Sequence, residues 1–330
     1  MISNNLTFQT AGKEEVLQSV APAELQQLSN HQSIIPKLAR NEQLLREIDS
    51  ILPNLPTFHR FYRQDSRKME FLQAESLHLV LTSPPYWTLK EYHDSPGQLG
   101  HMADYEEFLE QLDRVWQQSY EALVPGGRLI CVVGDVCLSR KKNGRHTVVP
   151  LHASIQEHCR RIGFDNLAPI IWYKIANANY EVEGGSSFLG KPYEPNGVVK
   201  NDIEFILMQR KPGGYRTPSL IERAFSVISE KKQKVWFNQI WSGLPGASTK
   251  NHPAPYPLEL ACRLIRMFSF VGDLVLDPFS GSGTTALAAW QTGRNSVSCE
   301  IDKQYFDQSI KRFEQNTRNL TSRHLVDVYR

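Results

Sequence analysis

Residues 82 to 87 combine a hydroxyl group, two adjacent prolines and two aromatic rings in the order Thr-Ser-Pro-Pro-Tyr-Trp. They follow the apolar run 77–81, whose composition predicts a buried strand that ends in a rigid loop. Because prolines have no N–H, the Ser83 hydroxyl and the Ser83 and Pro84 carbonyls would be fixed acceptors, which suits an amino group. Tyr86 and Trp87 offer flat faces on which a planar ring could stack. A plain Ser-Pro-Pro turn with aromatics that cap a core is the alternative interpretation.

A second stretch, 274–285, reads Leu-Val-Leu-Asp-Pro-Phe-Ser-Gly-Ser-Gly-Thr-Thr. It predicts a buried strand, a glycine-rich turn where a ligand can approach the backbone, and a helix that starts near residue 286. Taken alone, Gly281-x-Gly283-x-x-Ala286 also fits a dinucleotide fingerprint, with Glu300 placed to hold a ribose. A nicotinamide oxidoreductase is therefore an alternative, although it gives no reason for the Ser-Pro-Pro-Tyr stretch.

Together, the two stretches resemble the S-adenosylmethionine-dependent DNA methyltransferases that modify an exocyclic amino group, in the permuted "beta" order. In that family the Ser-Pro-Pro-Tyr loop precedes the Phe-x-Gly-x-Gly loop, as it does here between about Phe58 and about Phe313. The resemblance implies an α/β Rossmann-like methyltransferase fold: a mostly parallel sheet with helices on both faces, a circularly permuted motif order and an inserted target-recognition region. The early and late strands must then interleave in one sheet.

The resemblance also assigns roles to matching residues. The catalytic loop would be Ser83, Pro84, Pro85 and Tyr86, with Tyr86 stacked on a base flipped out of the duplex. The cofactor S-adenosyl-L-methionine would have Asp65 beside its adenine, Glu300 on its ribose hydroxyls and the glycine loop around its methionine end. The predicted cofactor-binding set is Asp65, His252, Pro253, Asp277, Pro278, Phe279, Ser280, Gly281, Gly283, Thr284 and Glu300. Gln64 replaces a glycine that is frequent in the family, and a helix cap is the alternative role for Asp65.

The chemistry of this loop suits a poor nucleophile. The lone pair of an exocyclic amine is delocalised into the ring, and fixed acceptors on its two hydrogens favour a pyramidal nitrogen, so catalysis is mostly positioning and electrostatics. Adenine enzymes of the family more often have Asp or Asn at the position of Ser83. We therefore expect N4 of cytosine as the target, with N6 of adenine as the alternative. Methylation of cytosine carbon-5 would need a Pro-Cys pair, which is absent from the chain.

The chain has 37 Lys and Arg against 35 Asp and Glu, a net charge of +2, so a DNA footprint must come from local clusters. The densest basic run is 139–146. The predicted DNA contacts are Trp87, Arg140, Lys141, Lys142 and Arg145. The predicted partner is double-stranded DNA, together with a cognate restriction endonuclease that would act on the same site without touching this chain. A non-catalytic DNA-binding module, with salt-dependent DNA affinity and no cofactor affinity, is a further alternative.

The domain organisation is expected to be simple. Residues 1–57 predict a helical N-terminal extension that packs on the core, and 58–330 predict the catalytic domain, with 175–250 as the target-recognition region. The five cysteines form no CxxC pair, which predicts no metal site and a reducing, cytoplasmic setting. No apolar stretch is long enough to span a membrane, and residues 1–9 lack the apolar core of a signal peptide.

Overall fold

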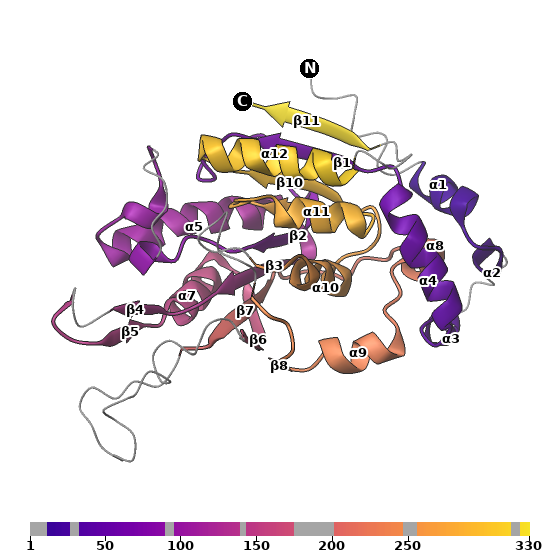
Figure 1. Cartoon of the computed structure of the whole chain (residues 1–330), viewed down its shortest axis with the longest axis horizontal. Helices are drawn as coiled ribbons and strands as arrows, with labels where there is room; N and C mark the ends of the chain where they lie inside the picture. The colour runs from indigo at the N-terminus through magenta and orange to yellow at the C-terminus, as the bar shows by residue number, and fades with distance from the viewer. Residues whose placement is uncertain are drawn as a thin grey trace, which may run out of the picture.

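The computed structural model describes residues 12–26, 33–89, 96–138, 143–174, 201–246, 256–317 and 324–330. Its centre is a nine-stranded sheet in the order β11-β1-β10-β9-β2-β3-β7-β6-β8 (Figure 1). Within it, only β7 runs antiparallel to its neighbours, so the prediction of a mostly parallel sheet is confirmed. The strands are β1 Phe58–Tyr62, β2 Leu77–Thr82, β3 Leu123–Val133, β6 Asp165–Tyr173, β7 Ile203–Arg210, β8 Ile240–Trp241, β9 Leu274–Asp277, β10 Asn295–Cys299 and β11 Leu325–Tyr329.

Helices cover both faces of the sheet, as predicted (Figure 1). The apolar residues of β2 alternate between two layers, because successive side chains of a strand point to opposite faces. Val80 packs in the layer of α5 (Tyr105–Ala122) and α7 (Leu151–Ile162), whereas Leu79 and Leu81 pack in the layer of α10 (Leu258–Phe268) and α11 (Thr284–Gln291). Next to α11, α12 (Lys303–Thr317) buries Phe306 and Phe313 against Phe61 of β1.

Strands that are far apart in the sequence are neighbours in the sheet. β2 pairs in parallel with β9, through Leu79 with Val275 and Val80 with Leu276, and β1 pairs in parallel with β10. The early and late halves therefore interleave, and the carboxyl ends of β1, β10, β9 and β2 open at one edge. β11, to which the sequence analysis assigns no element, adds a parallel strand outside β1.

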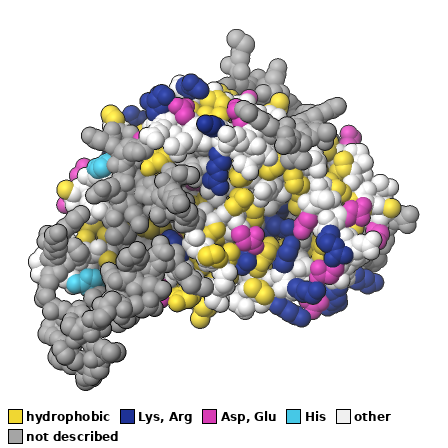
Figure 2. Space-filling model, viewed as in Figure 1, with side chains coloured by type: hydrophobic (Ala, Val, Ile, Leu, Met, Phe, Trp, Pro, Cys, Tyr) yellow, Lys and Arg dark blue, Asp and Glu magenta, His cyan; other side chains and the backbone are white. Residues whose placement is uncertain are grey.

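The N-terminal helices form a layer of their own beside the sheet. They are α1 Lys13–Val20, α2 Ala23–Gln26, α3 Ile34–Leu38, α4 Glu42–Ile51 and the 3-10 turn η2 Leu52–Asn54. Leu17, Leu44 and Ile48 share a buried cluster with Phe225 of α8 (Leu220–Phe225). Basic and acidic side chains alternate on the surface over these helices and α9 (Glu230–Trp236), as Figure 2 shows, which is the pattern of a solvated face.

The interval predicted as a target-recognition region, 175–250, contributes directly to the central sheet. β7 and β8 both lie in this interval, and β7 pairs with β3 over six residue pairs. The part available for an insertion between sheet strands is thus 211–239 together with 175–200, which lies outside the described residues. A separate hairpin of β4 (Val136–Leu138) and β5 (Thr147–Val149) follows β3. Among the described helices, none combines the length and apolar character needed to cross a membrane.

Candidate active site

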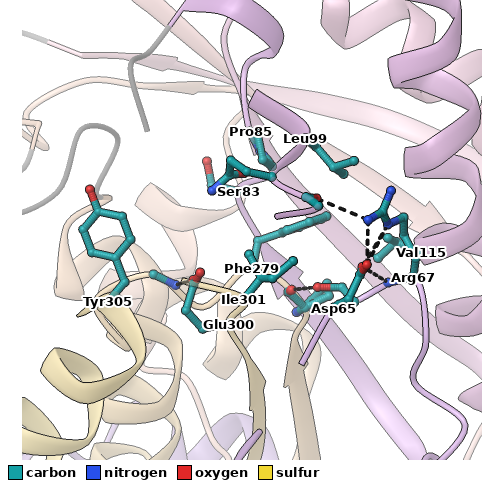
Figure 3. Close-up of a pocket in the computed structure, with 15 residues that line it drawn as sticks. Asp65, Arg67, Ser83, Pro85, Leu99, Val115, Phe279, Glu300, Ile301 and Tyr305 are labelled. Atoms are coloured by element: carbon teal, nitrogen blue, oxygen red, sulfur yellow. Dashed lines mark hydrogen bonds and ion pairs between the residues drawn. The ribbon is translucent and has the colours of Figure 1, made fainter. Parts of the chain in front are cut away.

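A pocket lies where the carboxyl ends of β1, β10, β9 and β2 meet (Figure 3). Three predicted site residues from distant segments, Asp65, Ser83 and Glu300, line it together. Carboxyl ends of parallel strands are the usual place for a ligand in an open α/β sheet. The complete lining is Asp65, Ser66, Arg67, Ser83, Pro85, Gly97, Gln98, Leu99, Val115, Pro278, Phe279, Gly281, Glu300, Ile301 and Tyr305.

Glu300 follows β10 directly and ties this strand to the glycine-rich loop. Its Oε2 accepts a hydrogen bond from Gly281 N at 2.8 Å, and its Oε1 accepts one from Asp302 N at 2.9 Å. Burial raises the pKa of Glu300 to about 7, although the two N–H donors favour the ionised form. Each carboxylate oxygen keeps a lone pair for a further donor, so Glu300 can accept hydrogen bonds from a ligand.

Asp65 has the opposite electrostatic setting on the other side of the pocket. Arg67 donates to it from Nε at 2.9 and 3.0 Å and from Nη2 at 2.6 Å. Burial alone would raise the pKa of Asp65, but the hydrogen bonds and charge of Arg67 outweigh it and hold the pKa below its usual value. Arg67 also donates to Gln111 at 2.9 Å and to the Gly97 carbonyl at 3.3 Å, so it links Asp65 to the segment that covers the pocket.

The hydroxyl of Ser83 has a defined direction. Ser83 Oγ donates to the Tyr86 hydroxyl oxygen at 3.3 Å, and Tyr86 in turn donates to the Val132 carbonyl at 3.4 Å. With its proton engaged in this way, Ser83 can present its lone pairs as acceptors. Both prolines are buried, and Pro85 lines the pocket beside Ser83 whereas Pro84 does not. Tyr86 is itself buried, with 4% of the residue's surface exposed, so protein atoms cover the faces of its ring. In this position its hydroxyl orients Ser83.

Trp87, the first residue of the turn η3 (Trp87–Leu89), lies directly after this loop and is strained. Its φ is +46°, a value that large side chains rarely adopt. The indole packs edge-on against Tyr105 at 5.0 Å between ring centroids, and its buried Nε1 has no hydrogen-bond partner among the described residues. Backbone strain of this kind concentrates at functional loops, where the surrounding structure enforces it.

Asp277 lies beneath the pocket, where it joins the ends of β2 and β9. Its Oδ1 accepts hydrogen bonds from Thr82 Oγ1 at 2.7 Å and from Phe279 N at 3.1 Å. Its Oδ2 accepts hydrogen bonds from Thr285 and Tyr256. Burial raises the pKa of Asp277, and the four donors act against this rise. Both oxygens of the Asp277 carboxylate therefore accept hydrogen bonds from the protein itself, and Asp277 does not line the pocket.

The glycine-rich loop needs its glycines for two reasons. Gly281 and Gly283 have φ values of +48° and +77°, in the left-handed region. A Cβ on Gly283 would also lie 3.0 Å from Ser309 Cβ of α12. Of the predicted loop residues, Pro278, Phe279 and Gly281 line the pocket, whereas Ser280, Gly283 and Thr284 do not.

The remaining predicted residues lie elsewhere or are not described. Arg145 is exposed and precedes β5 of the β4–β5 hairpin. Arg140, Lys141 and Lys142 lie outside the described residues, and so do His252 and Pro253.

A second polar pair, which the predicted site residues do not include, lies near the Ser83–Tyr86 loop. Lys174 and Glu204 form an ion pair at 2.6 Å. A Cβ on Gly134 would lie 3.5 Å from Glu204 Cγ and 3.6 Å from Tyr86 Cε2, so Glu204 and Tyr86 flank the same glycine. Glu204 and Tyr86 come close together because of the register in which β3 pairs with β7, and no local sequence pattern predicts that register.

Comparisons with known proteins agree with this geometry. A family model described as DNA methylase matches residues 77–311. The Type II methyltransferase M.MjaI of Methanocaldococcus jannaschii is 36% identical over 281 residues, which span 76% of this chain and 89% of that protein. The structure of TTHA0409 from Thermus thermophilus, complexed with S-adenosyl-L-methionine, is 47% identical, with a TM-score of 0.67, and the comparison covers 82% of this chain and all of that one. PvuII DNA methyltransferase, at 21% identity and a TM-score of 0.57 over 83% of this chain and 96% of that one, shares the fold.

We expect Asp277→Ala to destabilise the fold strongly, because it removes the shared acceptor of four buried donors, of which only Thr285 and Tyr256 keep another partner among the described residues. Each buried, unsatisfied group costs roughly 1–3 kcal/mol, so a loss of about 3 kcal/mol or more should appear in urea denaturation. Asp307→Ala, which removes a surface carboxylate from α12, is the control and should unfold at the wild-type midpoint. A wild-type midpoint for Asp277→Ala would contradict the structural role of this carboxylate.

Proposed function

Because the chain belongs to the DNA methylase family, whose members methylate exocyclic amino groups with S-adenosyl-L-methionine, we propose that it methylates N4 of cytosine in double-stranded DNA. The transfer would occur at a specific sequence, on a base flipped out of the duplex. The observation that carries the transfer to an amine is the hydroxyl of Ser83, which lines the pocket and is oriented as an acceptor. The choice of N4 of cytosine over N6 of adenine rests on serine at this position, where adenine enzymes of the family more often have Asp or Asn.

The residues of the pocket fit the cofactor. Glu300 offers carboxylate lone pairs for the two ribose hydroxyls, and Asp65, whose two oxygens already accept from Arg67, would place a negative charge beside the adenine. Phe279 and Ile301 supply apolar surface for the adenine ring. Gly281, which has no side chain, lets the methionine end approach the loop. When bound, S-adenosyl-L-methionine supplies a methyl group activated by its sulfonium.

The protein's own contribution is to position and polarise the amine. Ser83 Oγ and the Pro84 carbonyl would accept hydrogen bonds from the two amino hydrogens, which favours a pyramidal nitrogen with its lone pair free for the methyl group. The Tyr86 hydroxyl keeps the Ser83 proton away from the amine. Because these groups are held before the base arrives, they need no reorganisation during the reaction.

We further propose that the basic hairpin contacts DNA and that the chain serves a restriction-modification system. In the sequence, residues 139–146 join β4 to β5. These strands follow β3, whose carboxyl end lies at the same edge of the sheet as that of β2. A basic loop there can bind backbone phosphates. The name of the relative M.MjaI, a Type II methyltransferase, supports a cognate endonuclease that reads the same site.

The proposed function can be tested by identifying the methylated nucleoside. The protein is incubated with unmethylated DNA and S-adenosylmethionine carrying a labelled methyl group, and the product is digested to nucleosides. Labelled N4-methylcytosine is the expected result. Labelled N6-methyladenine would overturn the assignment of the base and keep the chemistry of the amine. No label across DNA of varied sequence would contradict the proposal as a whole.

Ser83→Ala should retain cofactor affinity and lose most of its turnover. The variant removes one of the two proposed acceptors, and by analogy with the loss of one preorganised hydrogen-bonding group, we expect kcat to fall about a hundredfold. Ser76→Ala, which removes a hydroxyl that donates to the local carbonyl of Gln73, is the matched control. Undiminished methylation by Ser83→Ala would remove this residue from the mechanism.

Cofactor binding should strengthen as the pH rises through about 7. The pKa of Glu300 is raised to about 7, and ribose hydroxyls donate to the ionised form, so protonation below this pH competes with binding. The ionised fraction predicts a dissociation constant about tenfold lower at pH 8 than at pH 6. Titration calorimetry over this range measures the effect.

Glu300→Gln serves as the comparison for the pH dependence, because it cannot ionise. It should bind the cofactor more weakly at pH 8, and its affinity should vary little with pH. Asp65, with its lowered pKa, stays ionised across this range and does not confuse the result. A wild-type affinity that is flat between pH 6 and pH 8 would show that Glu300 does not hold the ribose.

A further inference from the structure

The outer side of the glycine-rich loop is held by a single arginine of α12. Arg312 Nη1 donates to the Ser282 carbonyl at 3.1 Å, to Ser282 Oγ at 3.1 Å and to Thr284 Oγ1 at 3.0 Å. Ser309, one turn earlier on α12, lies so close to the loop that a Cβ on Gly283 would come within 3.0 Å of its Cβ. The loop between β9 and α11 is therefore clamped from behind by α12, and Gly281 is left on the pocket side.

Arg312 brings a positive charge to this loop, and no carboxylate in the described part of the chain balances it. It is partly buried, burial lowers the pKa of its guanidinium, and it forms no ion pair with any described acidic residue. The phenol of Tyr256 is the charge-bearing neighbour, but burial raises its pKa so far that it stays neutral. A guanidinium stays protonated even so, and a partly desolvated cation is costly unless an anion lies nearby.

The cofactor carries one such anion, the carboxylate of its methionine end. The N-terminus of α11 also carries partial positive charge, so Arg312 and the helix reinforce each other at the same loop. Arg312 does not line the pocket, which means that it acts through Ser282 and Thr284 and through its charge.

We propose that Arg312 is the positioning residue for the carboxylate end of S-adenosyl-L-methionine. It holds the loop from Ser282 to Thr284 in the conformation that receives this carboxylate, and it supplies the charge that balances it. This inference rests on the proposed placement of the cofactor in the pocket.

Two ligands separate this role from a general effect on the pocket. S-Adenosylhomocysteine carries the amino-acid end, and 5′-methylthioadenosine carries the nucleoside without it. We expect Arg312→Gln to raise the dissociation constant of S-adenosylhomocysteine about tenfold or more in titration calorimetry, because charge-assisted hydrogen bonds are lost. The dissociation constant of 5′-methylthioadenosine should stay within about twofold of the wild-type value. In turnover, KM for S-adenosylmethionine should rise while kcat at saturating cofactor changes little.

Lys311→Gln is the matched control, because it removes a positive charge from the adjacent, exposed position of α12. It should bind both ligands as the wild type does. Arg312→Lys keeps the positive charge but loses the forked N–H donors of the guanidinium. It should raise the dissociation constant of S-adenosylhomocysteine several-fold, about half the change caused by Arg312→Gln on a logarithmic scale. Arg312→Lys also carries the test if Arg312→Gln fails to fold in a thermal melt without ligand.

Two results would overturn the inference while the cofactor site stands. Equal weakening of both ligands by Arg312→Gln would mean that the arginine supports the whole pocket, and unchanged affinity for both would mean that the loop does not need it. Binding of neither ligand by the wild type would overturn the inference together with its premise, the placement of the cofactor.

Discussion

The site depends on one hydrogen-bonded junction between two strands that are distant in the sequence. Thr82 at the end of β2 donates to Asp277 at the end of β9, across 195 positions of the chain. The two strands share only two paired positions, so this bond and the hydroxyls of Thr285 and Tyr256 fix how the strand ends meet. Because Ser83 and the glycine-rich loop are the next residues of these strands, their relative placement follows from this junction. A buried carboxylate can serve here because all its donors come from the protein.

Above this junction, two carboxylates occupy contrasting environments at the ends of adjacent strands. Burial raises the pKa of Glu300, and its described hydrogen-bond donors are two backbone N–H groups, whereas Arg67 holds the pKa of Asp65 below its usual value. The difference suits two tasks. A carboxylate with a fixed charge is a constant acceptor, and one with a pKa near 7 couples ligand binding to proton release. Arg67 also donates to the Gly97 carbonyl, so it links the Asp65 carboxylate to the Gly97–Leu99 segment that lines the pocket.

The sequence predicted the local features well, because they depend on short patterns. The apolar runs before Ser83 and Asp277 became neighbouring strands, and Gly281 and Gly283 have the positive φ that a glycine-rich turn requires. What it could not predict arises from pairing across the chain. The clamp by Arg312 and the ion pair of Lys174 with Glu204 join segments with no shared pattern. The same holds for β7, whose place in the central sheet is set by its register with β3.

The direction of one hydrogen bond limits which ligand group the Ser83 hydroxyl could meet. A serine hydroxyl can donate or accept, so the Ser-Pro-Pro-Tyr pattern alone does not decide which ligand group it would meet. In the fold, Ser83 donates to Tyr86, and Tyr86 donates to Val132, so the proton of Ser83 is already used. A lone pair presented at this point attracts an amino hydrogen and repels a carbonyl oxygen. Cytosine and adenine carry an amino group where thymine carries a carbonyl in the major groove. The discrimination of amino from keto bases would therefore begin with the buried Tyr86 ring, which fixes the orientation of Ser83 before any base arrives.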